Sequence, residues 1–272
     1  MSNNINTTPA KRTTIWILAL LLITLIAAGG TLSYYRAQSQ RKNTFATGTI
    51  AVNINEPNWN DDLDGKELRL GSTRIKDPTL VAWAGEVYVR FRVEVRDMDD
   101  NTLLTGARLQ AVLDTLYYDP SYIYTGTADD DATKNIVKGD SYTTAELAGI
   151  PGVQKGYNHT NLDFIGTLDG HRGVLYFAYK DLDDIFVADK ANPANSDVVT
   201  LFTNVVIPAE WGNEVLALLE GDHGNGYYIT IRGEMIQANN IASRAEAFAL
   251  LDGDAKILAA GESIDYAAAD PF

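Results

Sequence analysis

The sequence contains no cysteine, and this absence excludes several chemistries at once. Disulfide bonds, cysteine-ligated zinc, iron–sulfur centres and cysteine nucleophiles all require a thiol. Histidine is scarce as well: His159, His171 and His223 are scattered, and none belongs to the H-E-x-x-H pair of helical zinc proteases. Neither the G-x-S-x-G nucleophile elbow nor the G-x-x-x-x-G-K-S/T phosphate loop occurs. No catalytic residue is predicted, and the protein is not expected to be an enzyme.

Basic residues are in deficit. The 272 residues include 22 Lys and Arg against 36 Asp and Glu, which gives a formal net charge of -14. Proteins bind nucleic acid largely by neutralising phosphates with Lys and Arg, so this balance argues against nucleic acid as a partner. Hydrophobic residues make up 46% and charged residues 21% of the chain. These shares exclude a mainly disordered protein and leave enough apolar chain for a large core.

Only one long apolar run is present, at residues 15–28, and it follows Lys11 and Arg12. As a helix these fourteen residues would span about 21 Å, short of the ~30 Å hydrocarbon core. A short apolar run behind a basic start and before small residues is typical of a signal peptide. We predict a signal peptide over 1–33, cleaved between Ser33 and Tyr34, and hence a secreted protein of the extracellular matrix or cell surface. The alternative is an uncleaved signal anchor.

After the signal, apolar and polar residues mostly alternate with a period of two. In residues 87–96 the apolar side chains, such as Val89 and Phe91, share one face, and Arg90 and Glu94 share the other. Such a strand places one face on a core and the other in water. Many short strands predict an all-β protein, a jelly-roll-like antiparallel β-sandwich, although the pattern does not separate it from an immunoglobulin-like topology. Further strands are predicted over 49–55, 163–168, 173–179, 198–207 and 227–236.

A few short helices are expected in the connections. Helical spacing occurs at 109–116, 210–219 and 243–251, the last with Ser243 and Glu246 placed as a capping box. The polar segment 125–156 is interpreted as a surface insertion, and the chain from 267 to 272 as a loose end. The predicted organisation is a flexible N-terminal segment at 34–44, a jelly-roll domain at 45–252 and a C-terminal tail at 253–272.

Calcium is the one small ligand that the sequence suggests. Asn60, Asp62 and Asp64 fit the first half of a D-x-D-x-D-G loop, but the twelfth position is glycine where the loop needs a bidentate Glu. Asp97 and Asp99 alternate in the same way without the glycine, and residues 181–184 hold a third acidic cluster. Acidic turns are more often simply solvated, so no cofactor is predicted and calcium is kept as an alternative.

Tyrosine is abundant, with fourteen residues. Tyr118, Tyr122 and Tyr124, around Pro120, are the candidates for stacking against a sugar. The more ordinary interpretation is that strand tyrosines half bury the ring and keep the hydroxyl in contact with water.

Five sequence blocks, taken in order, carry a family resemblance. The signal ends in Gly-Gly-Thr before the pair Tyr34-Tyr35, residues 55–59 read Asn-Glu-Pro-Asn-Trp, and residues 75–78 read Ile-Lys-Asp-Pro. Together the blocks resemble the TasA/camelysin family, and most closely its BsaA-type biofilm matrix proteins. The Leu-Ser before the cleavage site departs from the family's usual ending and leaves the exact site open. The blocks lie at 29–35, 43–59, 75–90, 201–211 and 236–248.

The resemblance implies a jelly-roll subunit of extracellular biofilm-matrix fibres, released by a SipW-type signal peptidase. Members of the family polymerise head to tail by donating the mature N-terminal strand to the next subunit, here a strand with Tyr34, Tyr35 and Phe45. The expected partners are therefore further copies of the chain, with other matrix proteins or polysaccharide as additional ones. Two alternatives stay open: a camelysin-like metalloendopeptidase, which the scattered histidines disfavour, and a secreted carbohydrate-binding β-sandwich.

Overall fold

The computed structural model describes residues 52–59, 69–82, 85–189, 195–221, 226–255 and 257–272. All of them belong to one compact unit, Ile50–Phe272. The predicted signal peptide and the segment 34–44 lie outside the described residues. In the part of the chain that is described, no helix is long and apolar enough to cross a membrane.

Seven short strands form one layer of the fold, which we call the short-strand layer. Its two ladders run in the orders β1-β3-β10 and β2-β11-β5-β6, and all their pairs are antiparallel. The ladders are continuous, because the Lys76 amide donates to the Thr203 carbonyl and the Leu201 amide donates to the Pro78 carbonyl. The strands are β1 (Val52–Asn55), β2 (Thr73–Ile75), β3 (Thr79–Ala82), β5 (Leu116–Tyr118), β6 (Gln154–Lys155), β10 (Val198–Thr200) and β11 (Asn204–Val206).

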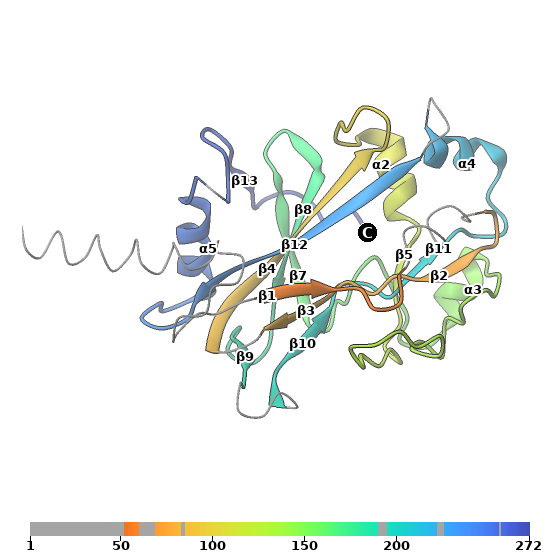
Figure 1. The fold of residues 1–272 in the computed structure, drawn as a ribbon. Coiled ribbons are helices and arrows are strands. Elements are labelled where there is room, and N and C mark those ends of the chain that lie inside the picture. Colours follow the sequence, from red (N-terminus) through yellow and green to blue (C-terminus); the bar gives the residue numbers. More distant parts are fainter. Residues whose placement is uncertain (1–51, 60–68, 83–84, 190–194, 222–225, 256) are drawn as a thin grey trace, which may run out of the picture. The chain divides into compact units, whose positions relative to one another are not determined.

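The second, long-strand layer is a single antiparallel sheet of order β12-β4-β8-β7-β13 (Figure 1). The central strand of this sheet is β4, which pairs with β12 along its length and with β8 over its middle. A short strand, β9, pairs with the beginning of β4. The strands are β4 (Gly85–Asp97), β7 (Leu162–Leu168), β8 (His171–Tyr179), β9 (Phe186–Ala188), β12 (Tyr227–Gln237) and β13 (Ile264–Asp265).

The central pairings follow the jelly-roll pattern, in which two antiparallel pairs are rolled together. One pair joins the segment 73–82 to 198–206, and the other joins β4 to β8. The predicted all-β sandwich is thus confirmed. The first strand departs from the pattern, because β1 pairs with β3 and not with the last long strand. As a result β12 ends its sheet with β4 as its only paired neighbour among the described residues.

The core lies between the layers and includes the predicted apolar face of β4. Val87, Val89, Phe91, Val93 and Val95 are each at most 2% exposed. At about 25 cal/mol per Å² of buried apolar surface, such a row is a large part of the stability of the domain.

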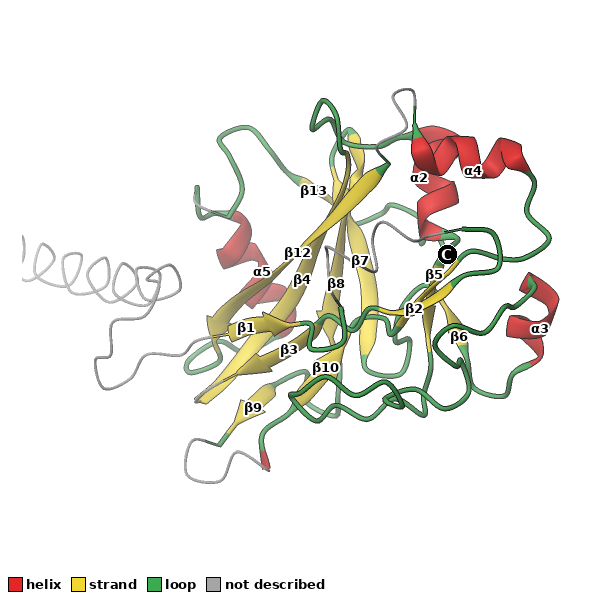
Figure 2. Ribbon diagram, turned by 45° about the vertical axis from the view of Figure 1, so that its right-hand side comes forward, coloured by secondary structure: helices red, strands yellow, loops and turns green. Residues whose placement is uncertain are grey.

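The prediction that the other face of β4 meets water is wrong. Tyr88, Arg90 and Glu94 are buried on this face. α5 (Arg244–Asp252) lies beside the long strands (Figure 2), and its Phe248 packs in one cluster with Tyr88 and lies over the guanidinium of Arg90. Arg90 is fully buried, with Nε 2.7 Å from Glu234 and Nη1 2.8 Å from Asp252. Alternation identified the two faces of the strand correctly, but a helix and an ion-paired arginine cover the face that was expected to be solvated.

The three predicted helices are present, as α2 (Gly106–Leu113), α4 (Asn213–Glu220) and α5. The Ser243 side chain accepts the amide of Glu246 as expected, but the Glu246 carboxylate accepts from Ala242, so the capping box is not completed. A further helix, α3 (Thr144–Gly149), was not predicted, although Thr143 and Glu146 form a complete capping box at its start.

The segment interpreted as a surface insertion and the segment interpreted as a loose end are both packed against the domain. Within 125–156, Ile136 and Leu147 are buried, and the buried Asp119 carboxylate accepts the amides of Asn135 and Ile136. This insertion therefore belongs to the domain rather than to its surface alone. The end of the chain is also held in place, because Phe272 packs against aromatic side chains of the core.

Candidate functional site

The predicted processing and donor residues cannot be placed, since Ser33, Tyr34, Tyr35 and Phe45 lie outside the described residues. The first calcium candidates, Asn60, Asp62 and Asp64, lie outside them as well.

Asp97 is the last residue of β4, and Asp99 lies in the turn that follows. One Asp97 oxygen accepts the amide of Asp99 at 2.7 Å, and the other forms an ion pair with Arg108. The hydrogen bond from Arg108 holds the pKa of Asp97 below its ordinary value. The carboxylate therefore organises its own turn. Within the described ranges, no three acidic or histidine side chains are grouped so that they could hold a metal ion.

The histidines do not form a shared centre in the described chain. His159 stacks on Tyr157 with ring centroids 3.9 Å apart, and its Nε2 lies 3.0 Å from the Lys155 carbonyl oxygen. His171 is exposed at the start of β8. His223 lies outside the described residues.

The tyrosines around Pro120 use their hydroxyls within the protein. The Tyr122 hydroxyl donates to the buried Asp77 carboxylate at 2.6 Å, and the side-chain amide of Asn55 donates to the Tyr124 hydroxyl at 2.8 Å. These contacts tie the segment after β5 to the end of β1 and to the segment between β2 and β3. The stacking platform proposed for sugars is thus at least partly used as an internal brace.

The outer edge of β12 is the feature that stands out. Two backbone hydrogen bonds show which residues of this segment direct their backbone groups towards β4. The Met98 amide donates to the Gly226 carbonyl, and the Ala238 amide donates to the Glu86 carbonyl. Because backbone groups alternate in direction along an antiparallel ladder, even-numbered residues of β12 face β4 and odd-numbered residues face away. In the described chain, no strand pairs with this outward side. The residues whose amide and carbonyl groups point outward are Tyr227, Ile229, Ile231, Gly233, Met235 and Gln237.

The same odd-numbered residues direct their side chains towards the core. Ile229 and Ile231 lie opposite Val95 and Val93, but they are only half-buried, whereas the two valines are at most 2% exposed. The core is therefore sealed along β4 and incompletely covered along β12. β1 lies close to β12 without pairing with it. The described part of β1 has 4 residues against the 11 of β12, so within the described chain most of the edge has no neighbouring strand.

The edge has the two properties that strand addition requires. Its unpaired amides and carbonyls can extend the sheet, and its half-buried apolar side chains can be covered by alternate side chains of an added strand. The sequence predicted the strand at 227–236 but not its position at the end of a sheet. Pairing depends on the remote segments 52–55 and 79–82, and no local pattern records it.

The chain matches no protein-family model, and no curated protein matches it either.

Proposed function

We propose that this protein is a secreted structural subunit of extracellular biofilm-matrix fibres, and that each copy accepts the mature N-terminal strand of the next copy at its β12 edge. The observation that carries the proposal is this long edge, with which no strand of the described chain pairs on the outer side, above a half-covered core. An edge of this kind, left exposed, is a template for pairing with another chain.

The chain has a donor of matching length. The segment 34–44, which precedes β1, has 11 residues, the same number as β12. At about 3.4 Å per residue, both would extend over about 37 Å as strands. A donated strand would satisfy the outward amides and carbonyls of β12 and cover Ile229 and Ile231. Because donor and acceptor are different parts of the chain, the contact is head to tail and propagates into a filament.

Processing would control when assembly begins. The donor becomes free only after cleavage between Ser33 and Tyr34, for which a SipW-type signal peptidase is the proposed enzyme. A homopolymer needs no other component, and further matrix proteins or polysaccharide would join it as additional partners.

The test is deletion of residues 34–43 from the mature protein. We expect a folded domain that stays monomeric by light scattering, while the intact mature protein forms fibres in negative-stain electron microscopy. A synthetic peptide of residues 34–44 should cap the acceptor edge and shorten the fibres, and a shuffled peptide should not. Fibres that form equally well after the deletion would show that the N-terminal strand is not the donor.

A further inference from the structure

The opposite edge of the long-strand sheet, formed by β7, is closed. At one end of β7 the Leu162 amide donates to the Asn158 carbonyl, and the Phe164 amide donates to the Tyr157 hydroxyl at 3.2 Å. At the other end β13 pairs with Thr167 and Leu168. The closure continues beyond β7, where the Asp169 amide donates to the Ser263 carbonyl at 2.8 Å.

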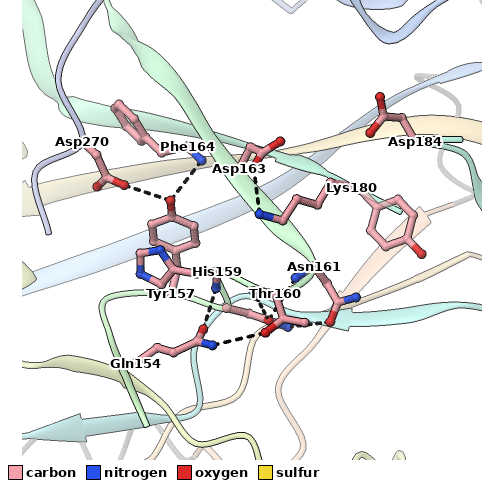
Figure 3. A network of polar contacts seen from close by, with 12 residues as sticks. Gln154, Tyr157, His159, Thr160, Asn161, Asp163, Phe164, Lys180, Asp184 and Asp270 are labelled. Atoms are coloured by element: carbon pink, nitrogen blue, oxygen red, sulfur yellow. Dashed lines mark hydrogen bonds and ion pairs between the residues drawn. The ribbon is translucent and has the colours of Figure 1, made fainter. Parts of the chain in front are cut away.

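The residues that close this edge are mostly the last ten of the sequence, 263–272, which we call the strap. Asp270 accepts a hydrogen bond of 2.9 Å from the Tyr157 hydroxyl, which in turn accepts the Phe164 amide (Figure 3). Burial and the Asp270 carboxylate raise the pKa of Tyr157, so the hydroxyl keeps the proton that it donates. Through Tyr157 the strap therefore also supports the half of β7 that β13 does not reach.

The end of the strap is anchored in the core. The Phe272 ring lies 5.7 Å from the Tyr157 ring and 6.4 Å from the Phe177 ring, measured between centroids. Gln110 of α2 donates to the Pro271 carbonyl at 3.1 Å. Aromatic contacts and hydrogen bonds of this kind hold a terminal segment that would otherwise fray.

The sheet also leaves space for the strap at one position. A Cβ atom on Gly166 would lie 2.4 Å from the Asp265 carbonyl oxygen, and Gly166 has a φ of +145°. Only glycine combines this backbone conformation with such a close approach.

We propose that the strap is a built-in edge strand that keeps β7 closed to strands from a second copy of this chain. In the described chain the long-strand sheet then presents one accepting edge, β12, in place of two. The effect of the strap on fibre shape rests on the proposed function, but the occupancy of the β7 edge by the strap does not. Short, covered edges are a general means of preventing edge-to-edge association.

The experiment uses the mature chain shortened to end at Glu262 and a fluorescent peptide of residues 263–272. We expect the shortened protein to capture the peptide, and the full-length protein to bind it at least about tenfold more weakly, because its own strap competes at millimolar effective concentration. A peptide with Asp270→Ala should bind the shortened protein more weakly than the unchanged peptide. Equal binding to both proteins, or no binding to a shortened protein that folds, would overturn the proposal.

If the shortened protein does not fold, full-length Asp270→Ala provides the test. Amide exchange at Phe164 and Asp169 should become about tenfold faster, with exposed Asp131→Ala as the matched control. Unchanged protection at both amides would count against the strap. If no variant forms fibres but the shortened protein captures the peptide, the proposed function fails and the strap stands. If the full-length protein forms linear fibres and the shortened one forms branched fibres, both stand.

Discussion

The two edges of the long-strand sheet differ in whether their outward backbone groups are hydrogen-bonded in the described chain. At the β7 edge, backbone groups are satisfied by β13, Tyr157 and the turn before β7, and the strap packs Phe272 into the core. At the β12 edge, the described chain offers no paired strand, and apolar side chains such as Ile231 stay half-buried. Both edges belong to one sheet and share one core.

The difference shows that an open edge in this fold is not the default. The chain commits its last ten residues, 263–272, to one edge, whereas no strand of the described chain pairs with the outer side of the longer strand at the other edge. Edge strands are a liability that proteins usually cover, twist or charge. The β12 edge is apolar and has no paired strand on its outer side in the described chain, whereas the β7 edge is closed. We propose that a strand from a partner explains this difference.

The largest expected effect comes from Arg90 of β4, which connects this strand to α5 and the strap. Its guanidinium contacts Glu234 on β12, Asp252 on α5 and the Tyr266 hydroxyl of the strap. Arg90→Leu leaves the buried Glu234 carboxylate and the half-buried Asp252 carboxylate without their cation and should lower the free energy of unfolding by about 3–5 kcal/mol. The exposed neighbour Arg232→Leu should cost less than about 0.5 kcal/mol. Urea unfolding of both variants measures this, and equal losses would contradict the anchoring role.

The next effect opens the closed edge without shortening the chain. Gly166→Val places side-chain atoms where the Asp265 carbonyl lies, so β13 should detach, at a cost of about 1–3 kcal/mol. Hydrogen exchange at Asp169 should accelerate while the amides of β4 stay protected. Gly149→Val is the control, because a Cβ there meets no atom within 4 Å. Unchanged exchange at Asp169 would mean that β13 tolerates the valine.

The smallest effect concerns β4, which lies between the two edges. Burial alone would raise the pKa of Glu94, but the hydrogen bond from Arg96 and the charges of Arg92 and Arg96 outweigh it and lower the pKa below 4.5. A lowered carboxyl pKa contributes stability above about pH 4.5, and this contribution is lost as the pH falls through the folded-state value.

Glu94→Gln should therefore reduce stability at neutral pH by about 1 kcal/mol and flatten its dependence on acid. Exposed Glu86→Gln on the same strand should change neither. Denaturant unfolding at neutral and acidic pH measures the slopes, and a Glu94→Gln variant with the slope of the original protein would contradict the assignment.

The strands and helices could be predicted from the sequence, but the segments that bury their faces could not. Period-two alternation located β4, β7, β8 and β12, because half-buried strands must alternate. It could not show that α5 covers Arg90, since the ion pair between Arg90 and Asp252 joins residues 162 positions apart. The predicted strand 198–207 is divided at residues 201–203, where the chain bends between two ladders.

The candidate site was even less visible. The composition of β12 does not mark it as an edge strand, because edge position is set by which remote segment pairs with which. One missed feature did leave a signal: Thr143 and Glu146 have capping-box spacing, yet the polar composition around them favoured a loop. The predicted donor residues Tyr34, Tyr35 and Phe45 remain predictions.

The most direct test of the account removes one outward hydrogen-bond donor from β12. Gly233 faces away from β4, so Gly233→Pro deletes an amide that only an added strand would use, while Gly233→Ala keeps it. Both mature proteins would be examined by negative-stain electron microscopy, with circular dichroism as a check on folding. The account predicts regular fibres for Gly233→Ala and dispersed, folded monomers for Gly233→Pro. Fibres of equal length and number from both variants would contradict it.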